Sequence, residues 1–542
     1  MAVVQRYTED LAHRYVAAGF WTADYPVDFW RRNATERPER TAIAAPDGRY
    51  SWKDAVSRID QFAGGLICDG WQRDDVLVLQ APNSAELLLL RLACEAAGIV
   101  TALVPFTFSR AEISVLTEQL HPRGVAIPAS ERGRELLGFY GPLEFRYTLG
   151  GPAISGTRSP MIWPAAGPCL GRGFKPYEYA AVVTTSGTTA VPKCIEHTAC
   201  ARLAAGRQYI DRLHLAADDV ICGFTSFFAG NCDLLLYHAA PQVGAKVVLL
   251  DKFTPERACE VIEREHVTGA IFVPTMLHRL LSYPQLDQHD LSSLRFVTSF
   301  GAMLAPEIAE QTEERLGVRV IQGYGASEYG ALASTAYDDP ANVRRRGIGR
   351  PLAGTEIEIR DEGGRVLPRG SRGRIYARGP YCVGGFVNND EGTRNLWING
   401  FLPMGDLGRL DEEGYLWLEG RARDVIIRGG QNIPPLEIED VLLRHPQVSE
   451  VAAVRMHDAE MGERVCVFVV PAKGSPPPDL ESLCAYMLER GLARFKLPER
   501  LELIDALPMN PAGTKVNKVA LEALINPASQ RAHEVTTEGG GS

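Results

Sequence analysis

The chain has 542 residues, of which 45% are hydrophobic and 23% are charged, and its formal net charge is −10. Because a single core stops growing at roughly 250–300 residues, this composition predicts a soluble globular protein with at least two domains. The acidic balance and the lack of a dense Lys/Arg block argue against a nucleic-acid partner, and the 11 scattered cysteines, with no CxxC pair, argue against a disulfide framework or a structural zinc site.

The N-terminal region predicts no targeting segment. Residues 1–21 carry charges throughout and lack the apolar core of a signal peptide. The most apolar stretch, residues 87–108, contains Arg91 and Glu95, so it predicts a buried helix followed by a strand and not a membrane span. With the odd number of cysteines, these features favour a cytoplasmic protein without a membrane partner. A monomer and a homodimer both remain open.

Helical and strand-like patterns alternate along most of the chain. The helical patterns cover residues 84–97 and 255–266, and the strand-like patterns cover residues 99–104, 247–250 and 269–273. This alternation predicts a mostly parallel α/β architecture.

After residue 350 the pattern changes. Residues 356–360 and 373–378 alternate between apolar and polar side chains, which predicts antiparallel strands with one solvent-facing side. Residues 424–524 predict a further small α/β unit, with a helix at 436–444 and strands at 451–456 and 465–470. The last five residues, Glu-Gly-Gly-Gly-Ser, predict a flexible tail.

The strongest local signal is the segment AVVTTSGTTAVPK at residues 181–193. An apolar strand leads into small hydroxyl residues and glycine, and Pro-Lys closes the loop. Backbone N–H groups and hydroxyls in such a loop can hold an anion, and the lysine supplies the countercharge. The spacing differs from that of the GxxxxGK[ST] phosphate loop. A polar surface loop is the alternative interpretation of this segment taken alone.

This loop resembles the signature loop of the adenylate-forming enzymes, a family of acyl-CoA synthetases, peptide-synthetase adenylation domains and luciferases. Their loop is commonly [ST]-S-G-[ST]-T-G-x-P-K-G, and here Ala190 and Cys194 stand in place of glycines, where a side chain restricts the backbone. Further family motifs follow in the family's order: SFGAM at 299–303, QGYGASE at 322–328, FLPMGD at 401–406, GRARD at 420–424, RGGQNI at 428–433 and PAGTKVNK at 511–518.

The resemblance implies an α/β fold with a large N-terminal domain and a small mobile α+β C-terminal domain. The large domain is expected to contain parallel α/β subdomains and a small antiparallel β subdomain. The implied boundaries are 1–420 for the large domain, 421–424 for a hinge centred on Asp424, 425–530 for the C-terminal lid and 531–542 for the tail.

The resemblance also implies the roles of individual residues. Lys515, Glu328, Lys193 and Thr188 are the implied catalytic residues, with Lys518 as the second candidate for the lysine, and Glu328 and Thr188 are the implied Mg²⁺ ligands. A carboxylate oxygen suits this hard cation. The implied nucleotide contacts are Thr185, Ser186, Gly187, Thr188, Thr189, Lys193, Gly301, Ala302, Tyr324, Gly325, Ser327, Asp406 and Arg421.

The implied reaction has two halves, with ATP, Mg²⁺ and a thiol as cofactors. A small carboxylic acid is first converted to its acyl-adenylate. The small domain then rotates about Asp424, and a loop containing Gly429 and Gly430 brings in the thiol of CoA or of a phosphopantetheine carrier protein. The expected enzyme is therefore an acid–thiol ligase.

The acid is expected to be cyclic and largely apolar, most simply aromatic. Both ends of the chain resemble the branch that activates aryl acids, but Phe228 stands where that branch has a polar gate. An aromatic ring can pack against the face of another ring. The implied acyl-pocket residues are Phe228, Asn231, Gly301, Gly323 and Ala326.

Three alternatives use the same residues. In the first, motivated by Ala190, Cys194, Met404 and the extra Thr514, the protein performs only thioesterification of an acyl-adenylate. In the second, it is a non-catalytic nucleotide- or acid-binding regulator. A luciferase-like oxidative enzyme has no specific support in the sequence.

Overall fold

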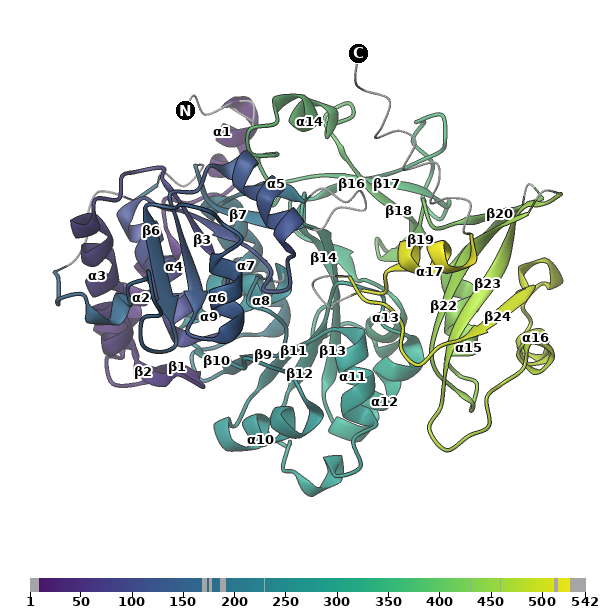
Figure 1. Ribbon diagram of the computed structural model, residues 1–542. Coiled ribbons are helices and arrows are strands. Elements are labelled where there is room, and N and C mark those ends of the chain that lie inside the picture. The colour runs from purple at the N-terminus through teal and green to yellow at the C-terminus, as the bar shows by residue number, and fades with distance from the viewer. Residues whose placement is uncertain are drawn as a thin grey trace, which may run out of the picture. The chain divides into compact units, whose positions relative to one another are not determined.

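The computed structural model describes residues 9–167, 173–174, 178–185, 192–228, 230–429, 431–458, 460–510 and 515–526 (Figure 1). The chain forms two compact units. The first unit comprises Met1–Ile357 and Ala377–Leu402, and the second comprises Glu358–Tyr376 and Pro403–Ser542. The predicted hinge, 421–424, lies within the second unit, and the predicted domain boundaries remain predictions.

The first unit contains a six-stranded sheet in the order β6-β5-β3-β4-β7-β8, parallel except for the pair β7–β8. Its strands are β3 (Val76–Leu79), β4 (Val100–Leu103), β5 (Gly124–Pro128), β6 (Phe145–Leu149), β7 (Tyr179–Thr185) and β8 (Lys193–Thr198). The helices of this region are α1 (Glu9–Ala17), α2 (Pro26–Glu36), α3 (Trp52–Asp69), α4 (Ala85–Ala97), α5 (Arg110–Leu120), α6 (Glu131–Leu137) and the 3₁₀ turn η1 (Pro160–Ile162).

A nine-stranded sheet forms the rest of this unit, in the order β15-β14-β13-β12-β11-β9-β10-β1-β2, with a parallel centre and antiparallel ends. Its strands are β1 (Thr41–Ala45), β2 (Gly48–Ser51), β9 (Val220–Gly223), β10 (Lys246–Leu249), β11 (Gly269–Phe272), β12 (Phe296–Ser299), β13 (Arg319–Ala326), β14 (Gly330–Ser334) and β15 (Arg350–Pro351). The helices are α7 (Ala199–Leu213), α8 (Gly230–Cys232), the π-helix η2 (Asp233–Ala239), α9 (Ala240–Val243), α10 (Pro255–Glu265), α11 (Pro274–Leu281), the 3₁₀ turn η3 (Leu286–Gln288), α12 (Pro306–Leu316), α13 (Ala341–Arg346) and α14 (Asp390–Asn395).

The second unit contains most of an antiparallel sheet in the order β16-β17-β18-β19 and a five-stranded sheet in which β21-β20-β23-β22 follow one another and β24 pairs with β23. The strands are β16 (Glu356–Arg360), β17 (Gly373–Arg378), β18 (Leu402–Leu410), β19 (Leu416–Arg421), β20 (Ile426–Arg428), β21 (Gln431–Ile433), β22 (Val448–Asp458), β23 (Gly462–Pro471) and β24 (Arg500–Leu503). The helices are α15 (Pro435–Leu442), α16 (Leu480–Glu489), the 3₁₀ turn η4 (Arg494–Lys496) and α17 (Lys518–Ile525).

Local sequence signals explain where the helices begin and end. The Ser51 hydroxyl accepts from the Asp54 amide at the start of α3, and Gly70 ends that helix with φ of 99°. The Ser84 hydroxyl likewise caps the start of α4, and Gly98 ends that helix. All residues of α4 are buried. A left-handed residue after the last turn suits glycine because it has no Cβ. The predicted α/β class and the predicted elements at 84–104 are confirmed.

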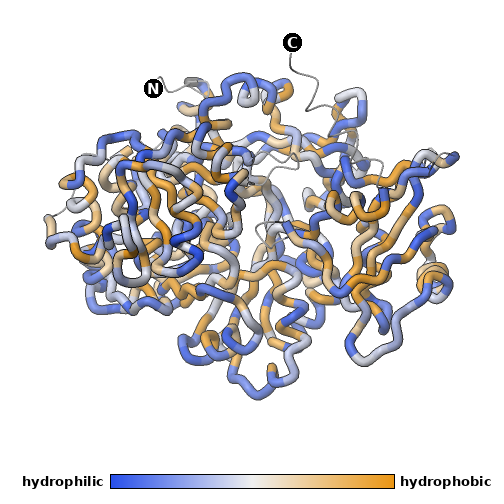
Figure 2. The backbone as a smooth tube through the Cα atoms, viewed as in Figure 1, coloured by the Kyte–Doolittle hydropathy of each residue, from blue (hydrophilic) through white to orange (hydrophobic). Residues whose placement is uncertain are grey.

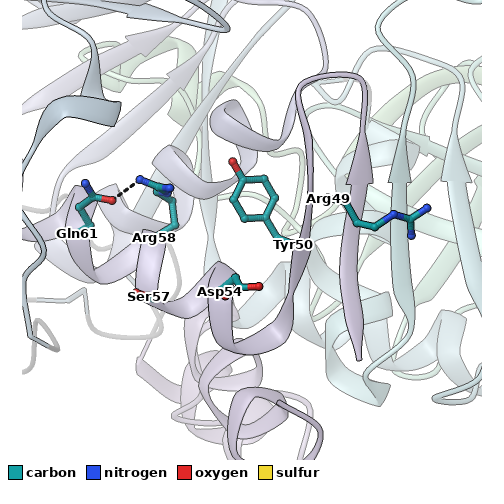
Figure 3. Close-up of a pocket in the computed structure, with 6 residues that line it drawn as sticks. All are labelled: Arg49, Tyr50, Asp54, Ser57, Arg58 and Gln61. Atoms are coloured by element: carbon teal, nitrogen blue, oxygen red, sulfur yellow. Dashed lines mark hydrogen bonds between the residues drawn. The ribbon is translucent and has the colours of Figure 1, made fainter. Parts of the chain in front are cut away.

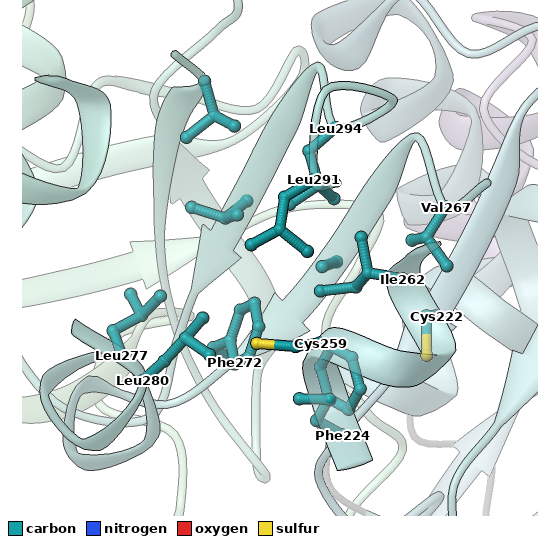
Figure 4. Close-up of a cluster of buried hydrophobic side chains, with 14 of the residues drawn as sticks. Cys222, Phe224, Cys259, Ile262, Val267, Phe272, Leu277, Leu280, Leu291 and Leu294 are labelled. Carbon is teal, nitrogen blue, oxygen red and sulfur yellow. The ribbon is translucent and has the colours of Figure 1, made fainter. Parts of the chain in front are cut away.

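Separate hydrophobic clusters form the core. One lies between the nine-stranded sheet and α10, α11 and α12, where Phe224, Ile262, Phe272, Leu280 and Leu294 are buried (Figure 4). The hydropathy tube shows orange segments along the strands and blue segments along many connecting loops (Figure 2). Among the described residues, no helix combines the length and the apolar character that a membrane span needs.

Candidate functional site

The predicted phosphate loop joins two antiparallel strands. Thr185, the last residue of β7, lies opposite Lys193, the first residue of β8, so the ends of the loop meet across the ladder. Four predicted contacts in the loop, Ser186, Gly187, Thr188 and Thr189, lie outside the described residues, as do Ala190 and Val191. Their roles remain predictions.

Cys194, where the family commonly has glycine, lies in a regular strand. It pairs with Thr184, its side chain is buried in the core, and burial raises the pKa of its thiol to about 12. Its φ is not positive. A side chain here therefore removes no backbone conformation that the strand uses.

Lys193 and Glu328 are brought together although 135 residues separate them in the chain. The Lys193 Nζ atom lies 3.4 Å from a Glu328 carboxylate oxygen and 5.5 Å from the centre of the Phe386 ring. Both charged groups reach solvent, with side-chain exposures of 45% and 23%. The pair places the lysine of the predicted phosphate loop beside a carboxylate, a group that can bind a metal ion.

The residues present fit Mg²⁺ bound together with a nucleotide. Among the described residues, no group of three or more His, Cys, Asp or Glu side chains has the arrangement of a metal site. Mg²⁺ commonly binds through one or two carboxylates together with substrate phosphates. Glu328 supplies one such carboxylate next to the predicted phosphate loop.

Glu328 lies in the tight connection between β13 and β14. The Tyr329 amide donates to the Ala326 carbonyl, and the buried Tyr329 hydroxyl lies 3.3 Å from the Thr355 hydroxyl. A Cβ on Gly325 would lie 2.0 Å from the Gly330 carbonyl oxygen, so the two strands require glycine for their close approach. The predicted adenine contact, Tyr324, is buried on β13.

The predicted acyl-pocket residues lie at the ends of neighbouring elements. Phe228 is 8% exposed and precedes α8, while Asn231 is 7% exposed within it. The side-chain oxygen Oδ1 of Asn231 accepts from the Cys232 amide, and among the described atoms its Nδ2 has no hydrogen-bond partner. Gly323 is required because a Cβ there would lie 1.9 Å from the Phe300 ring. Gly301 and Ala302 are exposed after β12, and Ala326 ends β13.

A buried charge network, which the sequence analysis did not identify, lies under this segment. One Asp233 oxygen lies 2.5 Å from Arg91, and the other lies 2.6 Å from Arg202 and 3.5 Å from His238. Burial opposes ionisation of Asp233, but Arg91, His238 and Arg202 hold its pKa well below the ordinary value. Asp233 is therefore already paired and is not available to anchor the ammonium group of an amino acid.

Arg202 also connects the acyl segment with the Glu328 loop. Its guanidinium donates to the Gly230 carbonyl at 3.1 Å and lies 3.6 Å from the position of a Cβ on Gly330. The Arg202 guanidinium is therefore close both to the segment that contains Asn231 and to the β13–β14 connection that contains Glu328. The sequence signal that could have located the charge network is Arg91 in the leucine-rich helix α4, because a buried charge needs a buried partner.

Two predicted nucleotide contacts, Asp406 and Arg421, are directly opposite each other in β18 and β19 of the second unit. The Arg421 Nε atom lies 3.5 Å from an Asp406 carboxylate oxygen. The Asp424 amide donates to the Arg421 carbonyl and closes a turn. Thus the two residues that resemble the family's nucleotide contacts are neighbours across the ladder. The predicted pivot, Asp424, lies in the turn that follows Arg421.

The two candidate lysines of the second unit have different surroundings. The Lys515 backbone is held by Asn510, whose amide donates to the Lys515 carbonyl at 2.7 Å and whose side chain accepts from the Lys515 amide. Lys518 is ion-paired through its Nζ with Glu439 of α15 at 2.6 Å. The ion pair with Glu439 argues against Lys518 as the residue that contacts substrate.

The predicted thiol loop is described in part. Gly429 has φ of 54°, and its amide donates to the Met461 carbonyl at 2.8 Å. Gly430 lies outside the described residues.

A surface hollow of about 290 Å³ lies elsewhere, beside β2 and α3 (Figure 3). It is lined by Arg49, Tyr50, Asp54, Ser57, Arg58 and Gln61. These residues include none of the predicted site residues that the structure describes.

Comparisons with known proteins match nearly the whole chain. The model of the AMP-binding enzyme family matches residues 30–387, and that of the AMP-binding enzyme C-terminal domain matches residues 437–514. The medium-chain fatty-acid–CoA ligase of Escherichia coli is 29% identical, covering 96% of this chain and 94% of its own. The salicylyl-CoA synthase / salicylate adenylyltransferase of a Streptomyces species is 30% identical, covering 96% and 97%. The amide bond synthetase McbA from Marinactinospora thermotolerans is 29% identical with a TM-score of 0.82, covering 92% of this chain and 100% of its own.

Proposed function

The chain belongs to the AMP-binding enzyme family, within the adenylate-forming superfamily, and on this premise we propose that it activates a cyclic carboxylic acid with ATP and transfers the acyl group to a thiol. The observation that carries the proposal is the contact between Lys193, at the end of the phosphate loop, and Glu328, which is far away in the sequence. Relatives that activate fatty and aryl acids support acid activation as the shared chemistry.

In the first half-reaction, a carboxylate oxygen of the acid attacks the α-phosphorus of ATP and pyrophosphate leaves. Lys193 attracts the departing phosphates, Glu328 holds Mg²⁺, and Lys515 contacts the carboxylate and the α-phosphate. Mg²⁺ held by Glu328 would supply positive charge that offsets the negative charge developing on the phosphates. Asp406 accepts hydrogen bonds from the ribose hydroxyls. These residues act by positioning and by preorganised charge.

Exchange of labelled pyrophosphate into ATP, measured with a panel of acids and no thiol, tests this proposal. Acid-dependent exchange supports the adenylating enzyme. If exchange is absent but a supplied acyl-adenylate is converted to a thioester, the thioesterification-only alternative is correct. Absence of both reactions, with retained nucleotide binding, would identify the regulator.

In the second half-reaction, the small domain rotates about Asp424 and the segment at Gly429 and Gly430 replaces Lys515. The thiol of CoA or of a phosphopantetheine carrier then attacks the acyl carbonyl and AMP leaves. Similarity to an amide bond synthetase favours one further acceptor, an amine. Incubating the acyl-adenylate with CoA, a carrier protein or an amine in parallel, and identifying the product by mass spectrometry, distinguishes these acceptors.

The substitution Asp424→Pro tests the pivot. Proline holds φ near roughly −65° and removes the N–H that donates to the Arg421 carbonyl. One half-reaction should lose at least about tenfold more rate than the other, because one domain orientation is favoured. Asp424→Ala keeps the N–H and is the control. Equal and mild losses in both half-reactions would mean that the pivot lies elsewhere.

The proposed acid class rests on the aromatic Phe228 beside the acyl segment, on the pairing of Asp233 with arginines, and on the salicylate-activating relative. The Escherichia coli relative makes linear fatty acids the competing class. A benzoate-type or fused-ring acid should therefore have a higher kcat/KM than octanoate or any amino acid.

The substitution Phe228→Ala should raise the KM for the preferred acid by roughly 2- to 12-fold, which corresponds to the 0.5–1.5 kcal/mol of an aromatic pair. The KM for ATP should stay nearly unchanged and serves as the internal control. A preference for octanoate, or an equal rise in both KM values, would refute the aromatic pocket and leave adenylation chemistry intact.

A further inference from the structure

We propose that His197 is a positioning residue for Glu328: as a neutral imidazole it donates from Nε2 to the backbone of the loop that carries this carboxylate. The inference rests on the proposed function, because it is the role of Glu328 in holding Mg²⁺ that makes its position important. The motif comparison assigns no role to His197.

The geometry comes from β8, which also carries Lys193. Side chains four residues apart in a strand point to the same face and are separated by about 13 Å. The long Lys193 side chain reaches the Glu328 carboxylate at 3.4 Å, and the His197 ring lies 3.3 Å from the Ser327 carbonyl oxygen. One face of β8 therefore contacts two consecutive residues of the loop.

The partner determines the tautomer of His197. A carbonyl oxygen can only accept, so the hydrogen must be on Nε2, and Nδ1 must be the bare nitrogen. The ring is buried, and Nδ1 has no hydrogen-bond partner among the described atoms. Burial, together with the charge of Arg202, lowers the pKa of His197 to about 3, so the ring is neutral when the enzyme works.

The other side of Glu328 is already held. Tyr329 is buried and its amide donates to the Ala326 carbonyl. The hydrogen bond from His197 to the Ser327 carbonyl restrains the peptide unit directly before Glu328. Without it, that peptide unit can rotate and the carboxylate loses its fixed direction, whereas the buried Tyr329 side chain still anchors the end of the turn.

A pair of amide substitutions tests the position of the donor. Gln at position 197 can place its amide NH₂ near the lost Nε2, whereas Asn is one methylene shorter and reaches only to the region of Nδ1. The probe is Mn²⁺, whose binding in the presence of a non-hydrolysable α,β-methylene analogue of ATP is measured by electron paramagnetic resonance. His197→Asn should weaken Mn²⁺ binding by roughly tenfold or more, as loss of a group that orients a ligand does. His197→Gln should recover most of that loss.

A second readout separates positioning from general damage. In pyrophosphate exchange, His197→Asn should raise the apparent KM for the Mg²⁺–ATP complex more than it lowers kcat. Glu328→Gln serves as the reference, because it shows how much exchange is lost when the carboxylate itself is removed. Thermal unfolding of each variant shows whether the fold is retained. Equal effects of Asn and Gln, or no effect of either, would overturn the proposal.

The unsubstituted protein provides a measurement that does not depend on the folding of His197→Asn. In ¹⁵N-histidine NMR, the His197 resonances, assigned by their loss in His197→Gln, should show a neutral Nε2–H tautomer at pH 7. A protonated ring or an Nδ1–H tautomer would overturn the proposal. Failure of the proposed function is seen separately, because the unsubstituted protein would then show no acid-dependent pyrophosphate exchange, whatever the tautomer of His197.

Discussion

Lys515→Ala is expected to lower the rate of adenylation by about 10²- to 10³-fold or more, because it removes a preorganised positive charge from the transition state. Thioesterification of a supplied acyl-adenylate should be nearly unaffected, since the proposed domain rotation would remove the lysine from the site in that half-reaction. Pyrophosphate exchange measures the first half, and thioester formation from synthetic acyl-adenylate measures the second.

Lys518→Ala is the matched control for this prediction. Both lysines lie in the same motif, and the Lys518 ammonium is paired with Glu439 at 2.6 Å. Its removal should leave pyrophosphate exchange within about threefold of the unsubstituted rate, because a partly exposed ion pair contributes little. If exchange falls in Lys518→Ala and persists in Lys515→Ala, the two assignments must be reversed.

Asp233→Ala is expected to destabilise the first unit by about 3–5 kcal/mol, because it leaves Arg91 and Arg202 buried without their shared counterion. The arginine side chains are 2% and 5% exposed, so water cannot replace the carboxylate. The loss should be local. Hydrogen exchange followed by mass spectrometry should show faster exchange in peptides from α4 and α7, which carry the two arginines.

An exposed ion pair in the same unit is the control for Asp233. Asp287 and Arg315 are 3.0 Å apart, but the Asp287 side chain is 74% exposed. Asp287→Ala should therefore change stability by less than about 1 kcal/mol. Comparable losses in both variants, or unchanged exchange in α4 and α7 of Asp233→Ala, would show that the buried network is not a stabilising element.

The structure confirms much of what local patterns predicted. Ser84 and Gly98 bound the predicted helix at 84–97, and the run at 99–104 forms β4. The alternating segments after residue 350 form β16 and β17, and β22 and β23 form in the predicted C-terminal unit. These elements were predictable because capping residues and the period of apolar side chains act within a few residues of each other.

The sequence by itself determined the family, the order of the motifs and the candidate residues. Each motif is a short run, so residues that are close along the chain are also close in space within the loop that they form. Tertiary structure alone decided which charges meet. The pairing of Asp233 with Arg91 spans 142 residues and that of Lys193 with Glu328 spans 135. His197 likewise gained its partner, Ser327, only when β8 and the β13–β14 connection came together. Such contacts arise when non-adjacent strands and helices pack, and no local period or motif records them, since an ion pair depends on distance in space and not on separation along the chain.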